Sequence, residues 1–159
     1  MKFLTPIQVL RQYAVPDDTL DSLFETRAHA MSERSFLIYE GKTWSWGEFR
    51  AAYLALARGL VSQGIRPGTR VAVMAVNHPA HLLTLFAVAR LGAIFVPVNP
   101  EFGVNEARYV FEHASVSVVI VDRTTLAVAR AAAAMLTPKP WFALIDSQAD
   151  DVMAFEALT

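Results

Sequence analysis

Short polar residues follow four apolar runs, and they are the side chains best placed to do chemistry in this sequence. They are Asn77, Asn99, Asp122 and Asp146. Ligands of open α/β sheets bind outside the carboxyl ends of the strands, so these four side chains could rim a binding site. Asparagine and aspartate are also favoured in turns and at helix starts, which predicts the same residues without any ligand. The turn interpretation is the more economical one, and we predict no catalytic residue here.

A glycine pair has the spacing of a phosphate-binding loop but lacks the rest of the motif. Gly59 and Gly64 are followed by Ile65 and Arg66, where the motif requires lysine and then serine or threonine. The pair also falls at the end of a predicted helix, whereas a phosphate loop connects a strand to a helix. We therefore expect no phosphate site at these glycines.

Metal-binding residue types are few and poorly spaced. The chain has no cysteine, which excludes thiolate-bound zinc, iron–sulfur clusters and a disulfide scaffold. His78 and His81 are three residues apart, but Pro79 lies between them and no third ligand has a recognisable spacing. Helix-cap or surface roles fit these histidines better than a metal site does.

The second half of the chain must position the strand-end residues, and it alternates strands with helices. Continuous apolar runs predict buried strands at 71–76, 93–98, 116–121 and 141–145. Helical periodicity between the runs predicts helices, including an Ala-rich one over 124–136 and one more after Asp146. The fold class is therefore α/β, with a mostly parallel sheet flanked by helices.

The first half predicts two capped helices and a small β-hairpin. Thr19 can cap the first helix, and the spacing of Ser45 and Glu48 is that of a capping box for the second. Short β-prone runs on both sides of Gly41 predict the hairpin. We divide the chain into a lead-in, residues 1–18, and an α/β subdomain, residues 19–159.

Composition limits the classes of partner and compartment. The chain has 159 residues, 54% of them hydrophobic, and a formal net charge of −1, so no basic surface is available for nucleic acid. The most apolar stretch, 82–98, is broken by Arg90, Gly92 and Pro97, which predicts no transmembrane segment. With no recognisable secretory signal at its start, the protein is expected to be cytoplasmic.

Five segments, in order along residues 20–122, resemble motifs of the adenylate-forming (AMP-binding) superfamily, which includes acyl-CoA synthetases, luciferases and peptide-synthetase adenylation domains. The segments are 43–49, 64–73, 89–100, 106–110 and 118–122. The first resembles the family's Thr-Tyr-x-Glu-Leu core motif. The third ends in Val-Pro-Val-Asn-Pro, which looks more like acid–CoA ligases than peptide-synthetase domains. Thr69 replaces a usual aspartate, and Glu101 stands where a basic residue is frequent, which argues against a CoA phosphate contact at that position.

The resemblance implies part of the large N-terminal domain of an acyl-CoA synthetase, or acid–CoA ligase. Such an enzyme uses ATP and Mg²⁺ to convert a carboxylate to an acyl-adenylate and then transfers the acyl group to CoA. The resemblance favours a fatty-acid or carnitine-like carboxylate as substrate. The family's phosphate loop, magnesium-binding acid, ribose-binding aspartate and C-terminal lysine do not occur in the sequence. We therefore expect an N-terminal fragment without the ATP-binding core and C-terminal domain, inactive alone and binding no cofactor.

A second hypothesis keeps the fold but not the chemistry. The self-consistent α/β pattern and the initiating Met1 also suit a free-standing, non-enzymatic interaction or dimerisation module. Under the first hypothesis, a sheet or helix face that normally packs on the missing part would be bare, and large exposed apolar patches drive association. We therefore expect the chain to self-associate.

Overall fold

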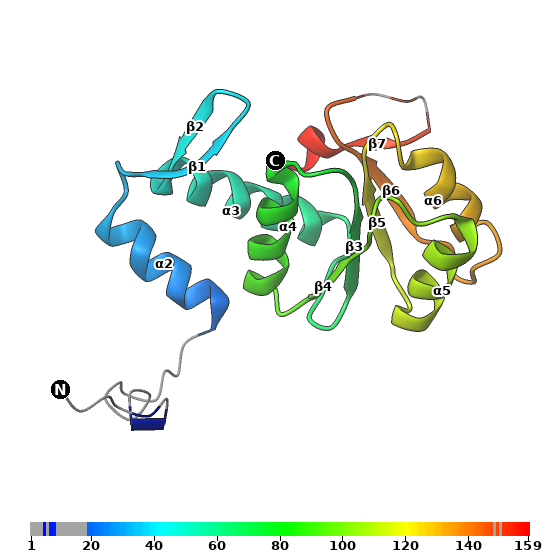
Figure 1. Cartoon of the computed structure of the whole chain (residues 1–159), viewed down its shortest axis with the longest axis horizontal. Coiled ribbons are helices and arrows are strands. Elements are labelled where there is room, and N and C mark those ends of the chain that lie inside the picture. The colour runs from blue at the N-terminus through cyan, green and yellow to red at the C-terminus, as the bar shows by residue number, and fades with distance from the viewer. Residues whose placement is uncertain (1–4, 6, 9–18, 148, 150) are drawn as a thin grey trace.

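Five short parallel strands form the central sheet (Figure 1). The structure is a computed structural model that describes residues 5, 7–8, 19–147, 149 and 151–159, so the lead-in expected over 1–18 lies almost entirely outside the described residues. The strands are β3 (Arg70–Met74), β4 (Ile94–Pro97), β5 (Val118–Val121), β6 (Trp141–Leu144) and β7 (Met153–Ala154), in the order β4-β3-β5-β6-β7. All neighbouring pairs are parallel, which confirms the predicted fold class.

Helices cover both faces of this sheet. The described helices around it are α3 (Trp46–Ser62), α4 (Pro79–Arg90), α5 (Val104–Ala114) and α6 (Leu126–Ala133). Figure 1 shows α3 and α4 on one side of the sheet and α5 and α6 on the other. Val71 and Val73 belong to the core cluster on the α3–α4 side, whereas Ala72 and Met74 belong to the other. Because successive side chains of a strand point to opposite faces, both must be apolar, which explains the uninterrupted apolar runs.

Two helices begin at capping boxes, one at the predicted box of Ser45 and Glu48 and one at Thr19, which was predicted only as a cap. The Thr19 hydroxyl accepts a hydrogen bond from the Ser22 backbone N–H at 3.1 Å, and the Ser22 hydroxyl accepts one from the Thr19 N–H at 2.9 Å. This box starts α2 (Leu20–Ala30). At α3, the Ser45 hydroxyl accepts from the Glu48 N–H at 3.1 Å, and the Glu48 carboxylate accepts from the Ser45 N–H at 2.8 Å. Among the described residues, no helix is both long and apolar enough to cross a membrane.

The predicted hairpin lies between these two helices. Strands β1 (Ser35–Tyr39) and β2 (Lys42–Ser45) pair antiparallel and form a separate sheet. The two residues between them, Glu40 and Gly41, have φ values of 45° and 78°. Positive φ at both central residues matches the twist of a two-residue hairpin, so Gly41 is the residue that makes this turn accessible.

An aromatic cluster holds α2 against the rest of the molecule. Phe24, only 3% exposed, contributes the central ring, and its centroid lies 4.4 Å from that of Phe86 on α4. Its other aromatic neighbours are Phe36, Trp46, Phe49 and Tyr53. Offset and edge-to-face pairs of this kind add to the free energy of apolar burial, so Phe24 contributes strongly to the packing of α2.

Two helix predictions were wrong, one in the type of element and one in its bounds. The segment after Asp146 forms β7 and then a single 3₁₀ turn, η1 (Phe155–Leu158), and not an α-helix. Its apolar residues Phe155 and Leu158 are both 3% exposed, and a spacing of three satisfies a 3₁₀ turn as well as an α-helix. The Ala-rich helix is α6, which is shorter than the predicted range because the threonines before it belong to a turn organised by Asp122.

A half-buried acid–base cluster also joins α2 to the neighbouring helices. Arg50 donates from Nε and Nη2 to Glu25 Oε2 at 2.9 and 2.6 Å, and the Tyr53 hydroxyl also donates to Glu25. Asp21 accepts from Arg90 Nη1 at 2.9 Å. The hydrogen bonds from Arg50 lower the pKa of Glu25, against the opposing effect of its burial. Burial and the Glu25 hydrogen bond raise the pKa of Tyr53.

Because the folded-state pKa of Glu25 is lowered, its contribution to stability is present above its unfolded pKa of about 4.3 and is lost as pH falls through the folded value. Glu25→Gln should lower the free energy of unfolding at pH 7 by about 2 kcal/mol, since it leaves Arg50 without its carboxylate. Measured by urea unfolding, the free energy of unfolding of this variant should also fall less steeply below about pH 4.5 than that of the wild type. Glu33→Gln, which changes an exposed carboxylate, is the control. Parallel pH curves for Glu25→Gln and the wild type would contradict the assignment.

Candidate functional site

Three of the four strand-end residues lie around the loop that follows β3. Asn77 is an exposed residue of this loop. The Asp122 carboxylate, at the end of β5, accepts a hydrogen bond from the Val76 N–H at 2.7 Å. The Asp146 carboxylate, at the end of β6, lies 2.8 Å from Nε2 of His78. Because the carboxyl ends of parallel strands share one edge of the sheet, residues far apart in sequence meet here.

Asn99 makes no described contact with the other three. It follows β4, which is the edge strand of the sheet. Its side-chain oxygen accepts a hydrogen bond from the backbone N–H of Glu101 at 3.0 Å. This is a turn within the chain segment itself, as asparagine commonly forms.

Asp122 organises the turn between β5 and α6. Its Oδ1 accepts from the backbone N–H groups of Thr124 and Thr125, both at 2.9 Å, and from the Thr124 hydroxyl at 2.6 Å. The buried Thr125 hydroxyl donates to the Met74 carbonyl at 2.6 Å. Burial alone would raise the pKa of Asp122, but the hydrogen bonds from Thr124, Val76 and Thr125 outweigh it and lower the pKa. The carboxylate therefore ties the ends of β3 and β5 together in its charged form.

The His78–Asp146 pair links the start of α4 to the end of β6. His78 is the N-cap residue of α4, and its Nδ1 accepts a hydrogen bond from the Ala80 N–H at 3.1 Å. Nδ1 must therefore be unprotonated, which leaves Nε2–H to donate to Asp146. A general base needs an unprotonated nitrogen directed at its substrate, and here that nitrogen serves the helix. The pair has the geometry of a structural link.

A cavity of about 320 Å³ lies beside this link. The hairpin, α4 and η1 contribute the residues around it, which include Tyr39, Lys42, Trp44, His78, Leu83, Asp146 and Phe155. The Lys42 ammonium lies 4.0 Å from the centroid of the Trp44 ring, which keeps the charge at the aromatic wall. Aromatic and aliphatic walls with a few polar groups suit a small apolar group.

The hairpin residues of this cavity were missed by the sequence analysis. Lys42 and Trp44 are two residues apart in a strand, so they share a face, and this period-two signal was available. The sequence gives no sign that the hairpin lies over the ends of strands that begin some thirty residues later. Nothing in the pattern marked His78 as the partner of Asp146, although a histidine before a helix-starting proline is in the N-cap position.

His78→Ala should lower the free energy of unfolding by about 1 kcal/mol, because it removes the cap of the Ala80 N–H. His78→Asn should recover most of this loss, since asparagine is a strong N-cap residue whose oxygen can accept the same hydrogen bond. Urea unfolding at pH 7 measures both variants. If the asparagine variant is as unstable as the alanine variant, the cap is not the role of His78.

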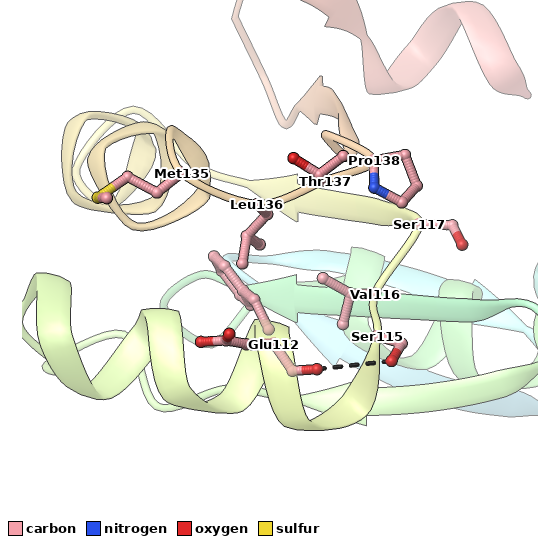
Figure 2. A pocket seen from close by; sticks show the side chains of 9 residues that line it. Glu112, Ser115, Val116, Ser117, Met135, Leu136, Thr137 and Pro138 are labelled. Carbon is pink, nitrogen blue, oxygen red and sulfur yellow. Dashed lines mark hydrogen bonds between the residues drawn. The ribbon is translucent and has the colours of Figure 1, made fainter.

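A second pocket, of about 460 Å³, lies at the opposite edge of the sheet (Figure 2). In Figure 2, Leu136 from the loop after α6 and Val116, which precedes β5, both line this pocket. Ser115, the C-cap of α5, donates from Oγ to the Glu112 carbonyl at 3.5 Å. This pocket contains none of the predicted strand-end residues, and it lies at the amino ends of the strands, whereas ligands of open α/β sheets bind at the carboxyl ends.

Neither a metal centre nor a phosphate loop is found in the described part of the chain. No group of three or more histidine, aspartate or glutamate side chains there is arranged to hold a metal ion. Gly59 lies inside α3, and Gly64 follows the end of this helix with φ of 89°. The glycine pair is therefore part of a helix and its C-terminal turn, as its sequence context predicted.

Comparisons with known proteins place this chain in a family. The profile of the AMP-binding enzyme family matches residues 24–154. A feruloyl-CoA synthase from Amycolatopsis sp is 38% identical over 94 residues, which are 59% of this chain and 19% of that protein. The chain thus spans about a fifth of the length of this relative.

Solved structures share the fold. A protein from Rhodopseudomonas palustris assigned as a long-chain-fatty-acid CoA ligase superposes with a TM-score of 0.85 at 24% identity, over 92% of this chain and 37% of that one. Coronafacic acid ligase from Pectobacterium brasiliense gives a TM-score of 0.81 at 20% identity, over 89% of this chain and 29% of that one. At these identities the likeness concerns the fold. Together with the profile match over most of the sequence, it shows that the chain belongs to the AMP-binding enzyme family, the adenylate-forming superfamily, and matches its N-terminal portion.

Proposed function

We propose that the chain is the N-terminal portion of an AMP-forming acid–CoA ligase. The observation that carries this proposal is the family match over residues 24–154, supported by the identity to a feruloyl-CoA synthase. The whole enzyme would use ATP, Mg²⁺ and CoA, and its substrate would be a carboxylic acid of the fatty-acid or carnitine-like type. We also propose that it acts in the cytoplasm, where ATP and CoA are available.

Within such an enzyme, this portion would act as scaffold. Asp122 and Asn99 satisfy backbone groups of turns, and Asp146 holds the histidine that caps α4. Each strand-end side chain with a described contact thus has a structural partner. We therefore propose that Asn77, Asn99, Asp122 and Asp146 shape the sheet edge without taking part in the reaction, and that this chain alone is inactive and binds no cofactor.

A chimera tests the proposed function. Residues 24–154 would replace the matching segment of the Amycolatopsis feruloyl-CoA synthase, and ferulate-dependent exchange of pyrophosphate into ATP would be measured. If this portion is the scaffold of a ligase, the chimera should keep activity within about tenfold of the parent, a loss of about 1.4 kcal/mol. A chimera that unfolds at the parent's temperature but shows no exchange would overturn the proposal.

The inactivity of the chain alone needs its own assay. The 159-residue protein would be incubated with ATP, Mg²⁺ and a panel of fatty, carnitine-like and aromatic acids. We expect no acid-dependent pyrophosphate exchange with any of them. Exchange above the acid-free blank would show that the chain contains an ATP site and would contradict this part of the proposal.

We also propose that the chain self-associates through the free edge of its sheet. β4 is an outer strand, and Ile94 on it is 45% exposed. An unpaired strand edge with an apolar side chain can pair with the same edge of a second copy. Light scattering at micromolar concentration should show a dimer, and Ile94→Lys should shift it to monomer. A wild-type monomer would contradict the proposal and would also weaken the alternative that the chain is a dimerisation module.

A further inference from the structure

A third concave surface lies between the carboxyl-terminal half of α3 and the end of α4. It is an open groove of about 580 Å³. Leu54, Ala57 and Val61 form the apolar part of its α3 wall, which ends at Ser62, and Leu91 closes the groove at the end of α4. Residues at spacings of three, four and seven share one helix face, so the wall is a continuous apolar strip. The volume lies within the range of small-molecule sites.

Two arginines stand at this apolar groove. Arg90 is paired with Asp21 of α2 at 2.9 Å, so one carboxylate already neutralises it. Arg58 is exposed and has no carboxylate partner among the described residues, in contrast to Arg50 and Arg90. A guanidinium beside an apolar strip complements a molecule with one carboxylate and a hydrocarbon tail, because the fork of N–H donors matches a carboxylate.

We propose that this groove binds a free medium-chain fatty carboxylate, with the carboxylate on Arg58 and the alkyl chain along the strip from Leu54 to Val61. From Leu54 to Val61 the helix rises about 10 Å. An extended chain of roughly eight to nine carbons has about this length, since each carbon–carbon bond of about 1.5 Å advances a zigzag chain by about 1.3 Å. The site lies outside the strand-end cavity, and its binding is measured without ATP or CoA, so it stands apart from the proposed function.

Titration of the ¹⁵N-labelled 159-residue chain with octanoate, followed by amide chemical shifts, tests the site. Octylammonium, with the same tail and the opposite charge, is the comparison ligand. We expect octanoate to shift amides of residues 54–62 and 90–91, and to bind at least about tenfold more tightly than octylammonium, which corresponds to 1.4 kcal/mol. Equal affinities for the two ligands, octanoate shifts confined to other residues, or no shifts at millimolar octanoate would overturn the proposal.

A matched pair of charge reversals locates the carboxylate. Arg58→Glu should weaken octanoate binding at least about tenfold and should favour octylammonium. Arg108→Glu makes the same change of charge on α5, on the other face of the sheet, and should leave the octanoate affinity unchanged. Because Arg58 is exposed, its replacement is not expected to unfold the protein, and the amide spectrum verifies this directly. Equal losses in the two variants would show a general charge effect and would overturn the assignment.

Discussion

Asp122→Ala should lower the free energy of unfolding by about 3 kcal/mol, because it removes an ionised acceptor from several donors at once. The carboxylate accepts hydrogen bonds from the backbone N–H groups of Val76, Thr124 and Thr125 and from the Thr124 hydroxyl. Thr125 is only 3% exposed, so its N–H cannot gain a water without opening the turn. Urea unfolding at pH 7, where the carboxylate is charged, measures the loss.

Two asparagine variants provide a matched comparison. Asp122→Asn keeps the shape but turns an NH₂ group toward donors, and it should cost about 1–2 kcal/mol. Asp146→Asn changes the same residue type at the end of the next strand, where the side chain is 66% exposed and has His78 as its one described partner. Asparagine also tolerates the positive φ of 50° at this position, so the cost should stay below about 1 kcal/mol. Equal costs for the two variants would contradict the proposed role of Asp122.

Lowering the pH should remove the contribution of Asp122 to stability, as it does for Glu25. Its folded-state pKa is lowered, so its contribution to stability is complete above the unfolded pKa of about 3.9 and disappears as pH falls through the folded value. Glu25, in the contacts of α2, and Asp122, at the end of β5, thus both have lowered pKa values. Their charged forms stabilise the same folded state at neutral pH. Acid denaturation should be governed by these internal groups more than by exposed ones.

The regular part of the fold follows directly from the sequence. Strands buried on both faces must be apolar throughout, as 118–121 are, and a parallel sheet covered by helices buries its strands in this way. Capping boxes are equally local, since Ser45 and Glu48 are three residues apart and satisfy each other's backbone groups. Such features depend on a few neighbouring residues, so they can be predicted without knowledge of tertiary contacts.

The arrangement of the candidate site was only half predictable. The rule for parallel sheets brings Asp122 and Asp146 to one edge, but it does not tell which backbone or side-chain group each will contact. The His78–Asp146 contact joins residues 68 positions apart and depends on how α4 is seated on the sheet. The C-terminal 3₁₀ turn is similar, because its apolar spacing fits two helix types and its packing against α3 decides between them.

Gly59→Ala should destabilise the protein by about 2 kcal/mol, although alanine is normally the better helix residue by about 1 kcal/mol. A Cβ at Gly59 would lie 2.0 Å from the carbonyl oxygen of Leu158, so α3 and η1 cannot keep their present contact. The backbone of the 3₁₀ turn has to move away from the helix. The cost cannot exceed what docking of this turn contributes, which burial of Phe155 and Leu158 places at roughly 3–6 kcal/mol.

Removal of Leu158, whose backbone the new Cβ would meet, tests whether the effect of Gly59→Ala on stability changes sign. In a chain that ends at residue 157, Leu158 is absent, and Gly59→Ala should then be neutral or stabilise by up to about 1 kcal/mol. The comparison needs four urea curves, with and without each change, and the coupling between the two changes should be about 2–3 kcal/mol. Gly47→Ala is the milder control, because its Cβ would lie 3.1 Å from the movable Ser32 hydroxyl. If Gly59→Ala costs the same in both chain lengths, the close contact with Leu158 is not the reason for glycine at this position.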